Sequence, residues 1–398
     1  MDKSCPIPEP FRARAGTVFF LAGLFLLNVM ARFILAPLMP LVEQEVQITH
    51  AQAGSLFLVM SAGFAVAQSA SGFVSSRLTH RKALILSILT VGIALLGLGF
   101  IKSLSGIRLA LIVLGLAAGL HIPSALATIT AMVQRQDWGK AMGLHASAPT
   151  LGLVLAPLIV AALMGTLSWR TLMILLGALT LLVGTAFLVF ARCGDFPGDA
   201  PKPAAVKQIT RLPSFWLILF LFMMGIGGSV GIFTVLPLYL IAEGGMDAAS
   251  ANSLLGLAQI SGFVAALAGG WFADRLGPKR AMAILIAAGG AANILLGVAR
   301  DFWLIMVLFI QPALTGAFFP GAFTALSKIV PPNLRSVVAS LAIPIAFFMG
   351  AGAFPAFFGY LGQSYSFSLG LVLAGCFMLV GPFFALALRF VETDQEGC

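Results

Sequence analysis

The sequence has few charged residues, few cysteines and no carboxylate in the middle of any long apolar run. Charged residues make up 9% of the 398 residues and hydrophobic residues 60%, whereas a soluble protein carries about 25% charged residues. This composition excludes a soluble fold. Several apolar runs exceed the ~20 residues that a helix needs to cross a bilayer, whereas barrel strands alternate over about 10 residues. We therefore predict an all-α membrane protein.

The shortage of cysteine and the lack of catalytic patterns exclude further classes. The spacing of the 4 cysteines suggests neither a metal site nor a disulfide framework. The chain has no HExxH pair and no aspartates within its apolar runs, as a membrane-embedded enzyme would require. We expect no metal, no cofactor and no enzymatic activity.

Charged and Gly/Pro-rich points divide the chain into twelve candidate membrane spans. The first run is too long for a signal-peptide core and is interpreted as a retained span. The predicted limits are 17–43, 52–76, 83–101, 107–133, 140–165, 171–191, 214–242, 249–273, 281–299, 303–329, 336–362 and 367–388. The Pro-rich and charged segment 192–213 predicts a cytoplasmic linker between an N-terminal bundle, 1–191, and a C-terminal bundle, 214–398.

The net charge of +9 has a topological explanation. With a cytoplasmic N-terminus, 18 of the 23 lysines and arginines fall in cytoplasmic segments and four in outer segments. This bias fits the positive-inside rule with both termini cytoplasmic. The basic charge therefore gives no reason to expect a nucleic-acid partner, and the lipid bilayer is the expected environment. From size alone we expect a bacterial inner-membrane protein, and we expect a monomer.

The two halves of the chain repeat each other at an offset of about 198 residues. GFVSSRLTHRK at 72–82 matches GWFADRLGPKR at 270–280, and HIPSALATITAMV at 121–133 matches FFPGAFTALSKIV at 318–330. Each match lies at the same point of the same-numbered span. The pattern predicts two six-helix bundles related by an axis along the membrane normal.

The segment GWFADRLGPKR resembles the G-x-x-x-D-R-x-G-x-[KR]-[KR] loop signature of the major facilitator superfamily, and the resemblance extends over essentially the whole chain. It implies the twelve-helix fold of that family and transport by alternating access. It also implies that Asp274 caps a neighbouring helix and pairs with basic residues to hold a gate. The first copy has Ser76 and Thr79 at the Asp and second Gly positions. The candidate gating residues are Asp274, Arg275, Arg280, Arg77 and Arg81, although the arginines of the first copy can equally be topology-setting charges.

The fourteen acidic residues all lie in loops, tails or span ends, whereas Arg32 lies in the middle of the first span. A central arginine costs about 2.5–3.5 kcal/mol on insertion scales, and it does not lose its proton to escape that cost. It must face a water-filled cavity or meet an anion, or else it snorkels or bonds backbone carbonyls near Pro37 and Pro40. The guanidinium matches carboxylate and phosphate geometry. Because the first helix of each half lines the cavity in the family, the resemblance implies that Arg32 anchors an anion.

Polar residues accompany Arg32 in the first half. Asn28 lies four residues before it on the same helical face, and either contacts the ligand or orients Arg32. His121, Ser124 and Thr128 form one polar stripe on the fourth span. Because histidine titrates near neutral pH, His121 is the candidate for proton coupling, with substrate contact or a bond to a neighbouring helix as alternatives.

The second half differs from the first at the matching positions. Ser229 and Phe318 replace Arg32 and His121. This half predicts an apolar wall with a few neutral donors, so that the cargo is an amphipathic anion, although such residues also serve ordinary packing. The candidate substrate-binding residues of this half are Gln259, Gln311, Thr315 and Phe318. His145, about one turn inside the fifth span, is expected at the membrane interface.

Two functions follow from these patterns. The sequence predicts a secondary transporter of a small carboxylate or organophosphate, with uptake by proton symport as the favoured mode and sodium coupling and exchange as open alternatives. The alternative is a proton-coupled exporter of drugs or metabolites, because GLHASAPTLGLVLAP partly resembles the fifth-span motif of exporters in the family. Gly143, Gly152 and Pro157 match that motif, whereas Ala156 replaces its glycine.

Overall fold

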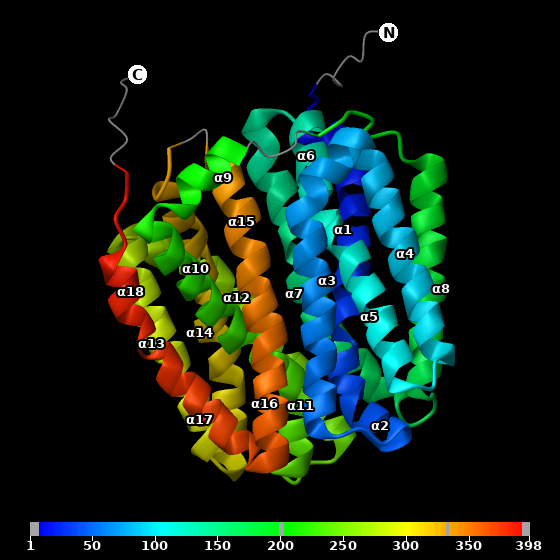
Figure 1. The fold of residues 1–398 in the computed structure, drawn as a ribbon, viewed down its shortest axis with the longest axis vertical. Helices are drawn as coiled ribbons and strands as arrows, with labels where there is room; N and C mark the ends of the chain where they lie inside the picture. The colour runs from blue at the N-terminus through cyan, green and yellow to red at the C-terminus, as the bar shows by residue number, and fades with distance from the viewer. Residues whose placement is uncertain (1–7, 199–202, 332–333, 392–398) are drawn as a thin grey trace. The chain divides into compact units, whose positions relative to one another are not determined.

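The structure is a computed structural model that describes residues 8–198, 203–331 and 334–391. Within these ranges, twelve helical segments are long and apolar enough to cross a membrane. They coincide with the twelve predicted spans, of which only the first and fifth begin clearly earlier than predicted. Residues 199–202 of the predicted linker and the charged tails lie outside the described residues. The chain is therefore an all-α, multi-pass membrane protein (Figure 1).

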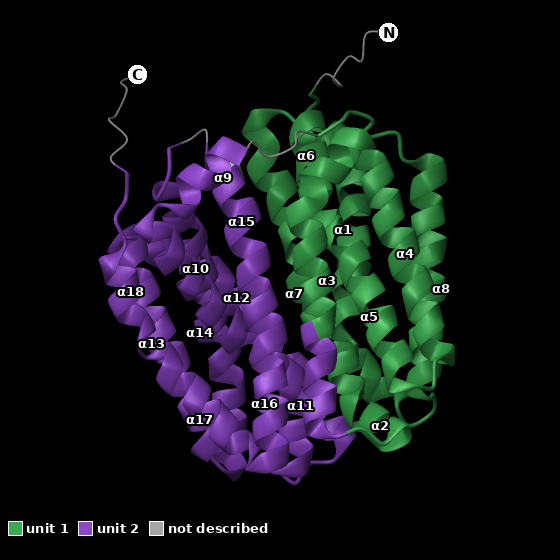
Figure 2. Cartoon of the chain, viewed as in Figure 1, with its two compact units in different colours: residues 1–48, 59–200 green, residues 49–58, 201–398 purple. Residues whose placement is uncertain are grey.

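The chain divides into two compact units (Figure 2). Unit 1 comprises residues 1–48 and 59–200, and unit 2 comprises residues 49–58 and 201–398. The border at residue 200 falls inside the predicted linker 192–213. Residues 49–58 form the beginning of one helix of the first half, yet they group with unit 2. Hydropathy does not predict this grouping, because the grouping depends on tertiary contacts.

Nine helical elements occupy the first half of the chain, within its described residues. They are α1 (Phe11–Phe33), α2 (Leu35–Val46), α3 (His50–Arg77), α4 (His80–Phe100), α5 (Leu104–Gly119), α6 (His121–Met132), η1 (Arg135–Asp137), α7 (Trp138–Leu163) and α8 (Trp169–Phe190). Because the bilayer offers no hydrogen-bond partners, each crossing satisfies its backbone groups internally as a helix.

The second half contains, in its described residues, two five-residue π turns, η2 and η4, each set between two helices of one span. Its elements are α9 (Pro203–Thr210), α10 (Pro213–Ile226), η2 (Gly227–Gly231), α11 (Ile232–Ala242), α12 (Ala248–Leu276), α13 (Pro278–Val298), α14 (Asp301–Lys328), α15 (Arg335–Phe348), η4 (Met349–Ala353), α16 (Phe354–Ser364), α17 (Phe367–Met378) and α18 (Gly381–Ala387).

Two spans of unit 1 are interrupted three residues before a proline. α1 gives way to α2 at Ile34, before Pro37, and α5 gives way to α6 at Leu120, before Pro123. A proline lacks the N–H that would bond the carbonyl four residues earlier, and its ring clashes with that carbonyl. The two breaks therefore lie directly beside Arg32, the candidate anion anchor, and His121, the candidate for proton coupling.

The first span begins at Phe11, six residues earlier than predicted, because a distant side chain caps it. The backbone N–H of Phe11 donates to Asp137 Oδ2 at 2.9 Å. Asp137 also accepts from Lys140 Nζ at 2.7 Å. The cap satisfies one of the free N–H groups of the first turn. Its partner is 126 residues away in the sequence, which explains why the local pattern did not predict it.

Helix α5 packs backbone to backbone on α3 through a Gly-x-x-x-Gly pair. A Cβ atom on Gly115 would clash with the carbonyl oxygen of Met60, and one on Gly119 would clash with that of Phe64. Small residues allow such close approach between membrane helices. The contact holds Phe64 beside the end of α5, where the aromatic ring is available to neighbouring α1.

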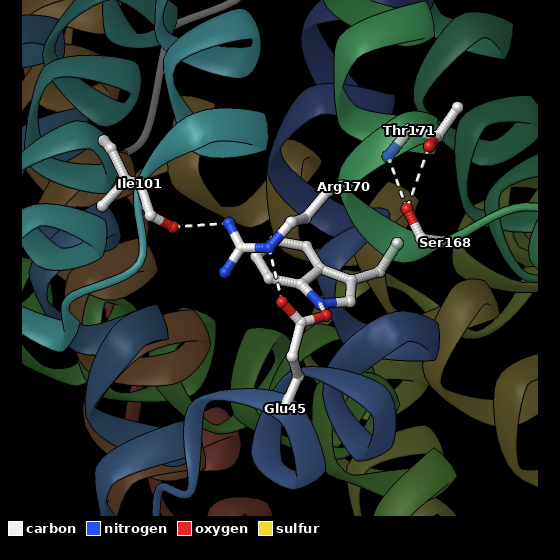
Figure 3. A network of polar contacts seen from close by, with 6 residues as sticks. Glu45, Ile101, Ser168, Arg170 and Thr171 are labelled. Carbon is white, nitrogen blue, oxygen red and sulfur yellow. Dashed lines mark hydrogen bonds and ion pairs between the residues drawn. The ribbon is translucent and has the colours of Figure 1, made fainter.

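The repeat predicted from the sequence is visible in equivalent helix caps. The Ser168 hydroxyl caps α8 and the Ser366 hydroxyl caps α17, each accepting from the N–H three residues later. At the end of α2, Glu45 accepts from Arg170 Nε and Trp169 Nε1, and Arg170 also donates to the Ile101 carbonyl (Figure 3). Glu243, 198 residues after Glu45, accepts from the Phe367 and Ser368 N–H groups.

Candidate functional site

Arg32 lies inside unit 1. Its side chain is 3% exposed, and its guanidinium carbon lies 4.5 Å from the Phe64 ring centroid and 5.3 Å from that of Phe33. Nε donates to the Asn28 carbonyl at 3.4 Å. A desolvated cation–π contact contributes about 2 kcal/mol, so the rings offset part of the cost of burial. The rings carry no negative charge, and a guanidinium matches the geometry of a carboxylate or phosphate.

Asn28 joins α1 to the interrupted end of α5. Its side-chain nitrogen donates to the Ala118 carbonyl at 3.3 Å. The residue is fully buried, and its Oδ1 atom has no hydrogen-bond partner among the described residues. A buried polar atom without a partner costs about 1–3 kcal/mol. Asn28 therefore has one atom that fixes helix packing and one that is available to a ligand or to the Arg32 region.

His121 lies at the start of α6 and is fully buried. Its ring is stacked with the Phe25 ring of α1, with centroids 5.2 Å apart, and the His145 ring of α7 lies 4.6 Å from Phe25. Neither nitrogen of His121 has a hydrogen-bond partner in the described part of the chain. Within that part, the structure therefore does not show the alternative, a hydrogen bond from His121 to a neighbouring helix.

His145 is more deeply buried than the sequence indicated. It was expected at the membrane interface, and it is 2% exposed and lies within 5.9 Å of His121, measured between ring centroids. His145 is buried because the face of α7 that carries it packs on α1, which the sequence did not indicate, and its depth in the membrane stays a prediction. Sequence reasoning also missed Phe25. Its spacing of three and seven residues from Asn28 and Arg32 places it on the same face of α1 and was the available signal.

Ser124 and Thr128 are both buried on α6, as the polar stripe predicted. The Thr128 hydroxyl donates to the Ser124 carbonyl at 2.8 Å. A Cβ atom on Gly194 would lie 2.7 Å from Thr128 Oγ1, so Thr128 contacts the segment that follows α8. Thr128 lies about 10 Å along the helix from His121, and its role in substrate binding stays a prediction.

The candidates in unit 2 are largely occupied by contacts within that unit. Gln311 Nε2 donates to the carbonyl of Gly228 in η2, and Thr315 Oγ1 donates to the Gln311 carbonyl at 3.0 Å. Phe318 packs on Gly225 and is 1% exposed. Gln259 is half-buried on α12. The Gln311 side chain therefore has a structural role, because it donates a hydrogen bond to a carbonyl of the π turn.

Of the five candidate gating residues, one forms an ion pair within unit 1 and four are exposed. Arg81 pairs with Asp195 at 3.5 Å and donates to the Leu188 carbonyl at 2.9 Å, both within unit 1. Arg275 stacks on Trp271 at 4.2 Å. In the described part of the chain Asp274 forms no ion pair. The exposed residues are Arg77, Asp274, Arg275 and Arg280. Their gating role stays a prediction.

The comparisons with known proteins agree on one family. The family model described as Major Facilitator Superfamily matches residues 21–342 and again residues 245–397. The chain belongs to the Major Facilitator Superfamily. The resemblance carried by GWFADRLGPKR is thus confirmed, and with it the assignment to a family of transporters rather than enzymes.

Two relatives and one solved structure extend this result. The gallate transporter of Pseudomonas putida is 31% identical over 213 residues, which are 53% of this chain and slightly less than half, 46%, of that transporter. A probable sulfoacetate transporter of Cupriavidus necator is 26% identical over 386 residues, covering 89% and 88%. A bacterial homologue of the human lysosomal transporter Spinster, inward-facing and occupied, has a TM-score of 0.83 at 16% identity and covers 96% and 97%. The last likeness confirms the fold.

Proposed function

We propose that this protein is a secondary transporter that carries a small organic anion across the bacterial inner membrane by alternating access. The observation that carries the proposal is the burial of Arg32 against two aromatic faces, in a chain whose acidic residues all lie at span ends, loops or tails. An anion bound to the guanidinium offsets the cost of its burial. The names of the relatives, which specify gallate and sulfoacetate, support an anionic cargo.

Asn28 and His121 complete the proposed site on the same side of unit 1. The free Oδ1 of Asn28 accepts a hydroxyl or protonated group of the cargo, and the free nitrogens of His121 donate or accept. His121 also binds the coupling proton, so that transport is symport. With the N-terminus in the cytoplasm, the basic residues follow the positive-inside rule.

An exporter of drugs or metabolites is the second candidate. Gly152 of the partial fifth-span motif packs on Val29 of α1, where a Cβ atom added to the glycine would lie 3.0 Å from Val29 Cγ1, so helix packing already accounts for that residue. A cationic drug would be repelled by Arg32. A weakly acidic drug would fit the same site, and a ligand screen separates the two functions.

The test is a thermal-shift screen of the purified protein against carboxylates, phosphates, sulfonates and cationic drugs, since a ligand of the folded state raises its melting temperature. We expect only anions to stabilise the protein. Arg32→Ala should lose this effect, because removing a buried charged contact costs about 2 kcal/mol or more, near 30-fold in affinity. Arg32→Lys should retain weak binding.

Arg12→Ala is the matched control, because Arg12 lies exposed near the start of the same helix. It should bind and accumulate anions as the wild type does. Full anion uptake in proteoliposomes containing Arg32→Ala would overturn the proposal, and stabilisation by cationic drugs alone would favour the exporter.

A further inference from the structure

Three parallel rings lie together at the centre of unit 1. The Phe25 ring is inclined to the His121 ring by 16° and to the His145 ring by 12°, and the two imidazoles are inclined to each other by 4°. Three different helices, α1, α6 and α7, supply them. The arrangement therefore depends on tertiary packing and not on one helical repeat.

The three centroid distances fix how the rings are placed. Parallel rings in contact are about 3.5 Å apart, so imidazoles on opposite faces of Phe25 would be separated by about 7 Å. The observed separation of His121 and His145 is 5.9 Å, which is too short for that arrangement. Both imidazoles therefore lie over one face of Phe25, side by side, with their edges toward each other.

The edges of these rings carry unused hydrogen-bonding atoms. Nδ1 and Nε2 of His121 and Nε2 of His145 are buried without a hydrogen-bond partner among the described residues. A neutral imidazole has one donor and one acceptor nitrogen, and a protonated one has two donors. Two adjacent imidazoles can form one N–H···N hydrogen bond when both are neutral, and that bond is stronger when the pair holds one additional proton, because the donor is then a charged imidazolium.

The charges around the pair favour one proton over two. His145 and Arg32 are the charged or titratable groups that act on His121. Two imidazolium rings at this distance, beside a guanidinium, would place three positive charges together, which is strongly unfavourable. The remaining titratable and charged residues of the helices around His121, on α1, α4, α5 and α7, lie toward the helix starts: Arg12, Arg14, His80, Arg81, Lys82, Arg108 and Lys140.

We propose that His121 and His145 form a single proton-binding unit that holds one shared proton, with Phe25 as the residue that positions the two rings. The proposal rests on the proposed function, in which a proton accompanies the anion. The proton comes from the aqueous phase and returns to it on the other side of the membrane. No covalent bond is formed or broken apart from the N–H bonds of the imidazoles.

This unit links proton binding to the anion at Arg32. An anion that neutralises the guanidinium removes a repulsive charge from the pair, so that protonation and anion binding favour each other. By thermodynamic reciprocity each raises the affinity for the other by the same factor. The device replaces the intramembrane carboxylate that the chain lacks, because an imidazole can bind and release a proton.

The experiment is a pH titration of the full-length protein in lipid nanodiscs, with its four histidines labelled with ¹⁵N and no cargo added. If the pair shares a proton, the signals of His121 and His145 follow the same two-step curve, because interacting groups titrate as a pair. In His145→Asn the His121 signal should follow one step, with a midpoint moved by about one pH unit or more. His121→Asn should have the same effect on His145.

The controls separate pairing from loss of structure. Phe25→Leu keeps both histidines and an apolar side chain, and it should separate the two curves without preventing folding. His80→Asn removes another buried histidine of unit 1, which contacts Phe196 at 4.9 Å between ring centroids, and should leave both curves unchanged. A His121 curve identical in the wild type, His145→Asn and Phe25→Leu would overturn the inference.

The outcome can be distinguished from a failure of the anion-transport proposal, because this titration contains no cargo. If Arg32→Ala binds and accumulates anions normally while the histidine curves remain coupled, the anion site is wrong and the proton unit stands. If anions bind in an Arg32-dependent manner while the two histidines titrate independently, only the shared-proton unit fails.

Discussion

The centres of the two units come from equivalent parts of the repeat but are filled in opposite ways. In unit 1, polar and aromatic side chains from α1, α6 and α7 occupy the centre. In unit 2, the π turns η2 (GGSVG) and η4 (MGAGA) bring backbone against backbone, so that a Cβ atom on Gly350 would lie 2.7 Å from the Gly227 nitrogen. The comparison teaches that one scaffold accommodates either a buried cluster of polar and aromatic side chains or a close backbone contact at equivalent positions.

The difference lies in the kinds of hydrogen-bonding groups that the two units bury. A π turn disturbs the regular backbone ladder, and in unit 2 the Gln311 side chain donates to a carbonyl of η2. In unit 1 the prolines interrupt the helices, and buried side-chain atoms of Asn28, His121 and His145 remain without partners among the described residues. Unit 2 also contains a buried atom without a partner among the described residues, Asn293 Oδ1 near η2. The unpartnered atoms of unit 1 differ in that they include titratable imidazole nitrogens close to a buried guanidinium.

The first test of this comparison replaces a residue of unit 1 with the residue at the equivalent position of unit 2. His121→Phe copies Phe318, and we expect accumulation driven by a pH gradient to fall by about 5- to 150-fold, the usual range of a coupling free energy. Anion binding at constant pH should weaken but remain detectable, because the His121 contact and its proton are lost while Arg32 is unchanged. Both are measured in proteoliposomes, and undiminished pH-driven accumulation would remove His121 from the coupling role.

The reverse change, Phe318→His, tests whether unit 2 tolerates such a group. Phe318 is part of a buried apolar cluster, so an imidazole there would lack a hydrogen-bond partner. We expect a loss of about 1–3 kcal/mol in the free energy of unfolding, with no new proton coupling. An unchanged melting temperature would contradict the description of the Phe318 surroundings as apolar.

The backbone contact in unit 2 makes the next prediction. Gly350→Ala should lower the free energy of unfolding by about 1–3 kcal/mol, because the added methyl group meets the Gly227 nitrogen and the Ile226 side chain. Gly143→Ala in α7 is the control, since a Cβ atom at that position would have no neighbour within 4 Å among the described residues. It should be neutral or stabilising in the same unfolding experiment. Equal losses in both variants would contradict the prediction.

The equivalent carboxylates Glu45 and Glu243 allow a finer comparison. Glu243→Gln should cost about 1 kcal/mol, because its carboxylate caps the start of α17 through backbone N–H groups. Glu45→Gln should cost less, since the side chain is 46% exposed and its partner is the Arg170 charge. The Glu45 effect should shrink in high salt. Thermal unfolding at two salt concentrations measures this difference, and equal salt dependence would contradict it.

The smallest effect is expected at the helix caps Thr49 and Asp247, 198 residues apart. The hydrogen bonds from Ser250 lower the pKa of the Asp247 carboxyl. Because the folded-state pKa is then below the unfolded one, the stabilisation is present above the unfolded value and is lost as pH falls through the folded value. Asp247→Thr copies Thr49, whose hydroxyl accepts from the Gln52 N–H at 3.3 Å. Its melting temperature should vary less with pH than the wild type below about pH 4.

Much of the fold was predictable, because membrane spans are set by local composition. The twelve spans, their repeat and the central position of Arg32 follow from hydropathy and spacing. The early start of α1 was not predictable, because it depends on Asp137, which is distant in sequence. The grouping of residues 49–58 with unit 2 has the same cause, since it reflects contacts and not composition.

The candidate site was predicted only in part. Arg32 and His121 were singled out because polar groups are conspicuous in apolar helices, and the structure places both inside unit 1. Ser124 and Thr128 followed from periodicity, but periodicity does not tell how far along the helix a ligand reaches. The burial of His145 was not predicted, because the sequence does not specify which face of α7 packs on α1.

The sequence by itself determined the number, length and order of the spans, since in lipid each segment must satisfy its own backbone hydrogen bonds. It also determined that a fixed positive charge lies at the centre of the first span. Only the tertiary structure decided which polar atoms meet. The Phe25, His121 and His145 rings come from three helices, and their neighbours depend on how those helices rotate and pack. The position of a single residue within its own helix leaves that rotation undetermined.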